Sequence, residues 1–295
     1  MARIVVIGRS GQVATELRHQ RLPKGWELVV LGREQLDLAQ PKAFKVILAE
    51  HEPDILINAA AYTAVDQAEN EEELATLVNG TAPGRLAKAA ADFGIPFLHI
   101  STDYVFDGSS RRPWTEDSAP NPINAYGRSK LAGERAVCDS AARALILRTS
   151  WVFSPFGSNF VKAMLRQAEI RQNLSVVADQ HGGPTSADSI AQALIRIAKS
   201  MDEGQDRSHS GIFNFSGQPT TTWADFAEAI FDKAVGIKNK PKVSRISTEQ
   251  YNTPAKRPLN SVLDCSKLAR VFEIKQPDWH DGLKRTLAAL APARE

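Results

Sequence analysis

Tyr126 and Lys130 are the residues of this chain whose types and spacing best suit proton transfer. They lie four residues apart in AYGRSKLAGE, which places both side chains on one face of a helix. A phenol titrates near pH 10, and lowering that to about 7 requires ~4 kcal/mol in favour of the phenolate. One positive charge ~4 Å away supplies about that much at an effective dielectric constant of ~20. The pair therefore predicts a general acid, Tyr126, tuned by Lys130, although a tyrosine and a lysine four residues apart also occur by chance in many helices.

Thr102 is expected to hold a substrate beside this acid. Ser101-Thr102-Asp103 follows a predicted strand at 97–100, at the carboxyl edge of a parallel sheet. Ligands bind along that edge in open α/β sheets. The Thr102 hydroxyl can therefore hold a carbonyl oxygen near Tyr126, although Ser101 and Thr102 could also merely cap a turn.

A glycine turn follows the first predicted strand. In GRSGQVA, Gly8 permits a tight turn, Gly11 lets the backbone approach a pyrophosphate, and Ala14 allows the next helix to pack closely on the sheet. Glycines at such a turn can be turn chemistry alone. Their place between a strand and a helix favours a dinucleotide site.

The second predicted strand indicates which dinucleotide is bound. It ends in Leu31-Gly32-Arg33, so an arginine stands where a carboxylate would accept from a ribose 2′-hydroxyl. Arg33, helped by Arg9, can pair with a 2′-phosphate, which favours NADP(H). The alternative is that Arg33 is an exposed loop residue.

The elements that must position these residues alternate between strand and helix in the first half. Strands are predicted at 3–7, 27–31, 54–57, 97–100 and 144–148, and helices at 12–20, 41–51, 72–93 and 123–142. Continuous apolar strands joined by helical crossovers are typical of parallel sheets covered on both faces. The fold class predicted is α/β, a Rossmann-type doubly wound parallel sheet with a smaller C-terminal substrate domain.

The alternation weakens in the second half. Helices are predicted at 160–171, 189–199 and 222–235, strands at 174–178 and 211–215, a surface loop at 201–210, and mostly irregular chain at 238–258. We expect residues 1–152 to form the NADP(H)-binding domain, with segments near 174–200 and 211–216 returning to it. Residues 153–295 are expected to form mainly the nucleotide-sugar-binding domain.

Composition excludes several other classes of protein. The 36 basic and 34 acidic residues leave a net charge of +2, so we expect neither a nucleic-acid nor a membrane partner. The two cysteines, Cys138 and Cys265, lack the spacing of a disulfide framework or a zinc site. No apolar run reaches membrane-spanning length, and the first residues lead straight into a strand, so a cytoplasmic enzyme is expected.

Eight stretches carry a resemblance that spans nearly the whole chain in order: GRSGQVATEL, NAAAYTAVDQAE, STDYVFDG, AYGRSKLAGE, LRTSWVF, DQHGGPTSA, TTTWADFA and PAKRPLNS. The chain resembles the extended short-chain dehydrogenases/reductases and, within them, the dTDP-4-dehydrorhamnose reductase family. The resemblance implies a Rossmann-type cofactor domain with a smaller nucleotide-sugar domain. It also implies the last step of dTDP-L-rhamnose synthesis, reduction of the 4-keto group of dTDP-4-dehydro-L-rhamnose by NADPH, with NADH as a second candidate reductant.

The resemblance also implies roles for individual residues. Tyr126 would protonate the developing alkoxide, and Lys130 would bind the cofactor ribose. Thr102, Asp103 and Trp151 would contact the sugar, although Trp151 could also be a core aromatic residue at a strand end. The remaining cofactor contacts would come from Gly8, Gly11, Gln12, Val13, Asp37, Leu38, Ala60, Ala61 and Thr63.

The chain departs from the family at a metal site. Members that bind Mg²⁺ at a dimer contact use three glutamates; here Glu16 matches, Asp188 is a shorter acid, and Ala289 replaces the third. Fewer carboxylates bind a hard cation more weakly, so Mg²⁺ at Glu16 and Asp188 is in doubt. Both a monomer and a homodimer stay open.

Related proteins offer competing functions. The 4,6-dehydratases of this superfamily carry Thr-Asp-Glu at the strand end, and Tyr104 replaces that glutamate here, which disfavours dehydration. Epimerases that recycle a bound NAD share the Tyr–Lys pair. A non-catalytic NADP-binding regulatory subunit of the methionine adenosyltransferase type, or a reductase of another nucleotide 4-keto-6-deoxyhexose, is the alternative; Trp151 in RTSW argues against the regulatory subunit.

Overall fold

The computed structural model describes residues 2–40, 44–204, 209–236 and 240–291. At its centre lies a parallel sheet with the strand order β10-β5-β4-β3-β1-β2. Its strands are β1 (Ala2–Ile7), β2 (Trp26–Leu31), β3 (Ile55–Asn58), β4 (Phe97–Thr102), β5 (Ala144–Thr149) and β10 (Gly211–Asn214). The chain runs outward from β1 to β2 and then crosses to β3 on the other side, so the strand order reverses at β1. This switch point opens a crevice at the carboxyl ends of β1 and β3.

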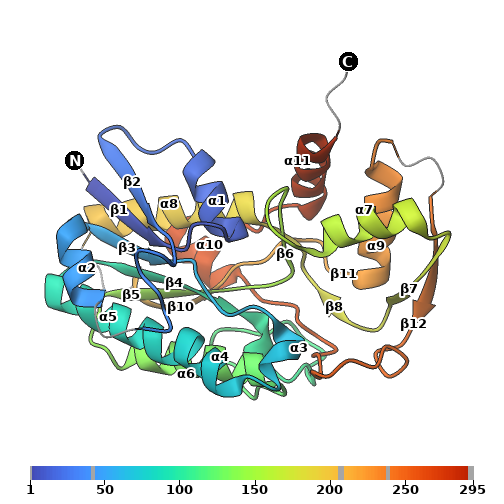
Figure 1. Ribbon diagram of the computed structural model, residues 1–295, viewed down its shortest axis with the longest axis horizontal. Helices are drawn as coiled ribbons and strands as arrows, with labels where there is room; N and C mark the ends of the chain where they lie inside the picture. Colours follow the sequence, from blue (N-terminus) through green and yellow to red (C-terminus); the bar gives the residue numbers. More distant parts are fainter. Residues whose placement is uncertain (1, 41–43, 205–208, 237–239, 292–295) are drawn as a thin grey trace.

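Helices cover both faces of this sheet (Figure 1). One face packs on α1 (Gln12–His19), α8 (Ala187–Glu203) and α10 (Ser266–Phe272), the other on α2 (Phe44–His51), α5 (Ala82–Phe93) and α6 (Ala125–Cys138). Alternate residues of β1 serve the two cores: Ile4 and Val6 face the first, and Val5 and Ile7 the second. The uninterrupted apolar run of this strand follows from that double burial, and the predicted doubly wound α/β fold is confirmed.

The helix predicted over 72–93 has a different winding in its middle. The short helix α3 (Val65–Ala68) precedes it, and α4 (Glu72–Thr76) continues through a π-helical turn, Leu77–Thr81, into α5. The amide of Asn79 in that turn is buried and bonds to both backbone polar groups of Tyr62. The π turn thus ties the loop after β3 to this helix.

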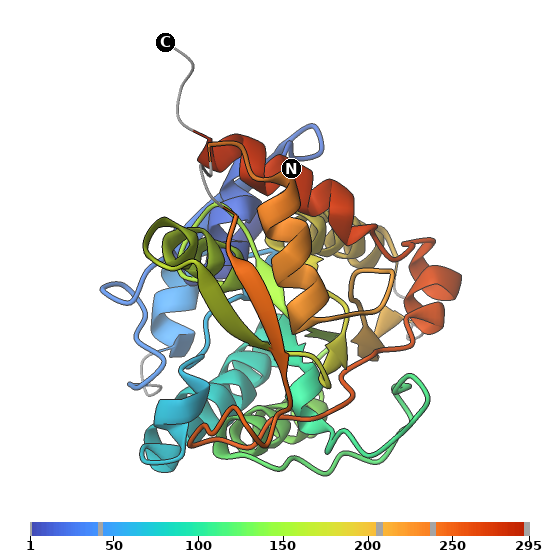
Figure 2. The same cartoon turned by 90° about the vertical axis from the view of Figure 1, so that its right-hand side faces the viewer.

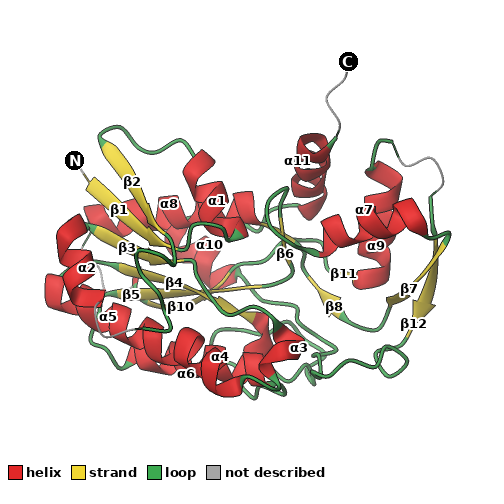
Figure 3. Ribbon diagram, in the orientation of Figure 1, coloured by secondary structure: helices red, strands yellow, loops and turns green. Residues whose placement is uncertain are grey.

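A smaller part of the molecule lies beyond the carboxyl end of the sheet, on the right of Figures 1 and 3. Its helices are α7 (Phe160–Ile170), α9 (Trp223–Lys233) and α11 (Trp279–Leu290), which share an apolar core with the parallel pair β7 (Asn173–Val177) and β12 (Lys242–Ile246). Short pairs join β6 (Val152–Phe153) to β9 (Thr185–Ser186) and β8 (His181–Gly182) to β11 (Thr221–Thr222). Figure 2 shows β12 and α9 facing the viewer from this end.

Several expectations for the second half need correction. The segment predicted at 174–178 pairs with β12 rather than returning to the central sheet, whereas β10 pairs with β5. The stretch 238–258, expected to be mostly irregular, is so among its described residues apart from β12, for which β7 supplies a long-range partner; residues 237–239 lie outside the described residues. The loop expected at 201–210 begins only after Glu203, and 205–208 lie outside the described residues, as do 41–43 before α2.

No helix among the described residues is long and apolar enough to cross a membrane.

Candidate active site

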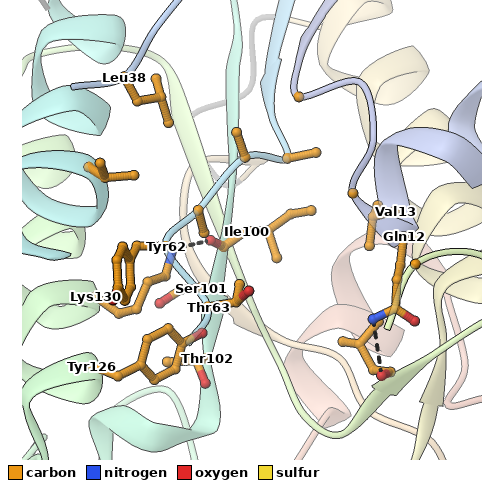
Figure 4. A pocket seen from close by; sticks show the side chains of 18 of the residues that line it. Gln12, Val13, Leu38, Tyr62, Thr63, Ile100, Ser101, Thr102, Tyr126 and Lys130 are labelled. Carbon is orange, nitrogen blue, oxygen red and sulfur yellow. Dashed lines mark hydrogen bonds between the residues drawn. The ribbon is translucent and has the colours of Figure 1, made fainter. Parts of the chain in front are cut away.

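A cavity of about 820 Å³ opens along the carboxyl ends of the central strands and reaches the smaller part of the molecule. Figure 4 shows Tyr126, Thr102 and Lys130 on one side of it and Gln12 and Val13 on the other. Every residue that the sequence proposed for the cofactor, the sugar or the proton lines this cavity: Gly8, Gly11, Gln12, Val13, Arg33, Asp37, Leu38, Ala60, Ala61, Thr63, Thr102, Asp103, Tyr126, Lys130 and Trp151.

The glycine turn leaves a helix end open toward the cavity. Gly8 has φ +108°, and a Cβ there would meet the backbone nitrogen of Ala60 at 3.1 Å, so both conformation and space require glycine. Gly11 caps α1 without a side-chain hydrogen bond. The first N–H groups of α1 are therefore available to an anion, as a pyrophosphate site needs.

Two arginines, Arg9 and Arg33, line the cavity. The Arg33 side chain is 82% exposed, with its Nε 3.4 Å from the Asp37 carboxylate. Arg9 pairs with Glu34, an acid whose position beside the turn the sequence reasoning missed. Both arginines line the cavity, and each pairs with a neighbouring carboxylate.

The helix that carries Tyr126 is fixed at its start. The Asn124 side chain caps α6 by accepting from the Gly127 N–H at 2.7 Å. A Cβ at Gly127 would lie 2.2 Å from the Tyr104 carbonyl oxygen, so glycine permits a close approach of α6 to the end of β4. This approach places the Tyr126 ring edge-on to Tyr104, with centroids 5.8 Å apart.

The expectation that Lys130 lowers the pKa of Tyr126 is wrong for this structure. Burial raises the pKa of Tyr126 to about 12, the hydrogen bond with Thr102 opposes that rise, and the nearby Asp103 carboxylate adds to it. The Lys130 Nζ is instead engaged with the Ile100 carbonyl oxygen at 2.7 Å and the His99 ring at 3.3 Å. Burial lowers the pKa of Lys130 itself to about 8, against the raising effect of Glu134. Desolvation therefore dominates both groups.

Asp103 lines this cavity and is almost fully buried. Its Oδ1 accepts from the Thr102 hydroxyl at 3.0 Å, while its Oδ2 is buried without a hydrogen-bond partner among the described residues. Burial raises the pKa of Asp103 to about 6, although hydrogen bonds from Ser261 and Thr102 lower it.

A buried ion pair anchors α6 to the sheet, and no local sequence pattern pointed to it. Arg148 of β5 binds Glu134 of α6 through two hydrogen bonds of 2.9 and 2.6 Å, and Ser101 donates to the same carboxylate at 2.6 Å. The Arg148 guanidinium also lies 5.0 Å from the Phe106 ring centroid. Because Glu134 is one turn beyond Lys130, this pair fixes the helix face that carries Tyr126 and Lys130.

Trp151 faces the cavity from the smaller side of the molecule. It has a positive φ of 46° and stacks on Trp223 with centroids 3.6 Å apart. A Cβ at Gly182 would lie 2.5 Å from the Trp151 ring, so that glycine makes room for it. Trp223 also lines the cavity and was missed, because its position at the start of α9 looks like an ordinary helix end.

The residues proposed for Mg²⁺ lie together but do not fit a metal. Burial and the Asp188 carboxylate raise the pKa of Glu16. Asp188 is already bound by Arg285 at 3.1 Å, Gln20 at 2.7 Å and Gln192 at 3.0 Å. A guanidinium thus neutralises the acid that a cation would need. In the part of the chain that the structure describes, no three His, Cys, Asp or Glu side chains gather as metal ligands.

Comparisons with known proteins agree with this geometry. The sequence model of the RmlD substrate binding domain family matches residues 2–291. A dTDP-4-dehydrorhamnose reductase of Sinorhizobium fredii is 45% identical over 98% of this chain and 97% of its own. The crystal structure of a Clostridium acetobutylicum dTDP-4-dehydrorhamnose reductase has a TM-score of 0.90 at 35% identity, covering 98% of this chain and 99% of the other. That of the Bacillus anthracis dTDP-4-dehydrorhamnose reductase in complex with NADP has a TM-score of 0.88 at 33% identity, covering 97% and 99%.

Proposed function

Since this chain belongs to the RmlD substrate binding domain family, together with dTDP-4-dehydrorhamnose reductases, we propose that it catalyses the last step of dTDP-L-rhamnose synthesis. In this reaction NADPH reduces the C4 keto group of dTDP-4-dehydro-L-rhamnose to the alcohol of dTDP-L-rhamnose. The observation that carries the proposal is one cavity that joins an open helix end at Gly11 to the cluster of Thr102, Tyr126 and Lys130.

The proton step follows from the chemistry of this cluster. NADPH, when bound, supplies the hydride that the carbonyl carbon accepts. The Tyr126 phenol delivers its proton to the developing alkoxide, and the Thr102 hydroxyl orients that oxygen. A phenol with a pKa of about 12 stays protonated at neutral pH, and an alkoxide is a stronger base than a phenolate, so the transfer remains favourable. Lys130, one turn after Tyr126 on the same face of α6, binds the cofactor ribose.

We assign the cofactor to the first half, and the sugar to the second half together with residues at the carboxyl edge of the central sheet. Gln12, Val13 and the other residues of the first half that line the cavity would hold NADPH, with residues 1–152 as the cofactor domain. The apolar core of α7, α9 and α11 supports 153–295 as mainly the sugar domain, apart from β10, α8 and α10, which pack with the central sheet. Trp151 and Asp103, which both line the cavity, would contact the sugar.

Arg33 and Arg9 support a preference for NADPH. Arg33 pairs with Asp37 and Arg9 with Glu34, and both ion pairs are accessible to solvent. A 2′-phosphate would be a stronger partner for each guanidinium than these carboxylates. The NADP complex of the Bacillus anthracis reductase supports the same cofactor. NADH would bind through the same turn with fewer contacts.

The alternative of a non-catalytic regulatory subunit is not favoured, because the relatives compared are reductases over nearly their whole length. Dehydration is disfavoured, because Tyr104 stands where the dehydratases carry a glutamate and offers no carboxylate for elimination. Burial also raises the pKa of Tyr104, so its phenol stays protonated at neutral pH. The free thiols of Cys138 and Cys265 support a cytoplasmic enzyme. The assembly would be a monomer or a homodimer, which size-exclusion chromatography distinguishes.

The test is NADPH oxidation, followed by absorbance, with dTDP-4-dehydrorhamnose and with its GDP and UDP counterparts. We expect many turnovers per enzyme, fastest with the dTDP sugar. NADPH binding without turnover of any of the three sugars would contradict a reductase, and a faster rate with GDP or UDP would reassign the nucleotide.

A further inference from the structure

Three fully buried polar residues form a line beneath the cavity. Asn58 at the end of β3 and His99 on β4 are register partners in the sheet, and Lys130 reaches them from α6. Asn58 Nδ2 lies 3.1 Å from His99 Nδ1, and His99 Nε2 lies 3.3 Å from Lys130 Nζ. The His99 ring therefore has a nitrogen partner on each side.

The orientation of the Asn58 amide determines which ring nitrogen carries a proton. Asn58 Oδ1 accepts from the Ala60 N–H at 3.2 Å, so the amide must present its NH₂ group to His99. Burial and the charge of Lys130 hold the pKa of His99 well below its usual range, so the ring is neutral. A neutral ring whose Nδ1 accepts from Asn58 carries its single proton on Nε2.

That proton points at the amine of Lys130. An ammonium has three donors and no acceptor, so it faces the Nε2–H as one donor against another. A neutral amine instead accepts the Nε2–H with its lone pair, donates one N–H to the Ile100 carbonyl oxygen, and keeps the other for the cavity that it lines. We propose that His99 is a positioning residue for Lys130, which fixes the direction of the Lys130 amine and favours its neutral form through a tautomer imposed by Asn58.

The other ionisable groups around Lys130 do not produce this preference. Glu134 on α6 attracts the ammonium, but its charge is shared with Arg148 of β5. Tyr126 on α6 is neutral at physiological pH, and the Asp103 carboxylate after β4 would favour the ammonium. Burial lowers the pKa of Lys130 to about 8 against the attraction of Glu134, and the Nε2–H donor of His99 would act in the same direction as burial.

The tautomer is tested directly by ¹H–¹⁵N NMR of protein labelled at histidine, with no ligand present. We expect the His99 ring, identified by its loss in His99→Phe, to show the Nε2–H pattern. The variant Asn58→Leu should shift this ring toward the Nδ1–H form, because Nε2 can then accept from the ammonium. An Nδ1–H ring in the unmodified protein, or a pattern indifferent to Asn58→Leu, would overturn the proposal.

The effect on Lys130 is tested by measuring NADPH affinity between pH 6 and 10. This test rests on the proposed function only in that NADPH must bind in the cavity. We expect affinity to fall above about pH 8 as the ammonium is lost, and His99→Phe to move that fall upward by roughly one pKa unit. An unchanged or lower midpoint in His99→Phe would refute the donor role. His51→Phe, the same substitution at the end of α2, should leave the midpoint in place. If the keto-sugar is not turned over while both results hold, the proposed function fails and this inference stands.

Discussion

Replacing Arg148 by methionine tests how strongly the Glu134–Arg148 pair holds α6. The side chains of Arg148 and Glu134 are only 1% and 2% exposed, and two hydrogen bonds of 2.9 and 2.6 Å join them. Methionine fills a similar volume but removes both hydrogen bonds that Arg148 donates. The Glu134 carboxylate then stays buried with the hydrogen bond from Ser101. The perturbation therefore isolates the cost of an uncompensated buried charge.

The magnitude follows from that burial. Removing one partner of a buried ion pair destabilises proteins by about 3–5 kcal/mol, much more than breaking an exposed pair. For a chain of this size about 1 kcal/mol corresponds to roughly 2 °C, so Arg148→Met should lower Tm by roughly 6–10 °C. The double variant Arg148→Met, Glu134→Gln should recover more than half of the loss, because no charge is then stranded.

Urea unfolding at pH 7.5, followed by tryptophan fluorescence and circular dichroism, measures these losses if the two signals coincide. Lys45→Met, which breaks the exposed pair with Asp92, serves as the matched control and should cost less than about 1 kcal/mol. A loss below about 1 kcal/mol for Arg148→Met, or no recovery in the double variant, would refute the reasoning that this pair anchors the helix.

Four further outcomes are expected. Tyr126→Phe should lower kcat by roughly 10²–10⁴-fold with NADPH affinity unchanged, and full activity would remove the phenol as the acid. Lys130→Met should weaken NADPH binding, which fluorescence titration checks; an unchanged affinity would contradict a contact between Lys130 and the cofactor ribose. Arg33→Ala should weaken NADPH by about tenfold and NADH less, and equal losses would return Arg33 to the surface. Because burial raises the pKa of Asp103 to about 6, the native state binds its proton more tightly than the unfolded chain does; stability falls as pH rises from about 4 to about 6, by at most about 3 kcal/mol. Asp103→Asn should therefore raise Tm at pH 7.5 and change it little at pH 4, and a gain of equal size at both values would argue against ionisation as the cause.

The central sheet was predictable because its signal is local. Each of its strands is an apolar run, as in RIVVI of β1, and each crossover helix has a recognisable start or stop, such as Gly94 after α5. The strand β12 was missed because KVSRI is half exposed and becomes a strand only by pairing with β7, far away in sequence. The helices α10 and α11 were missed too, since no strand–helix alternation frames them.

Gly8, Gly11, Tyr126 and Lys130 were predictable because glycine turns and the Tyr–Lys pair have fixed spacing, whereas Asp37, Ala60, Trp151 and other lining residues followed only from the family resemblance. Their electrostatics were not predictable. The direction of the Tyr126 pKa depends on how deeply the phenol is buried and on Asp103, neither of which spacing reveals. Asn79, His99 and Arg148 act from within helices and strands, where the sequence shows only one polar residue among apolar ones.

The return of β10 to the central sheet has a consequence for protein engineering. The chain leaves the sheet after β5, contributes α7 and β7 to the smaller part of the molecule, and comes back to cover the β5 edge with β10 before leaving again to add α9, β12 and α11. A fragment ending after β5 would expose that edge and the apolar faces left by α8 and α10, so it should self-associate rather than fold. A new ligand preference is better engineered by replacing the two segments that leave the central sheet, one between β5 and α8 and one after β10. Joining the first half of this chain to the second half of another would not preserve the sheet.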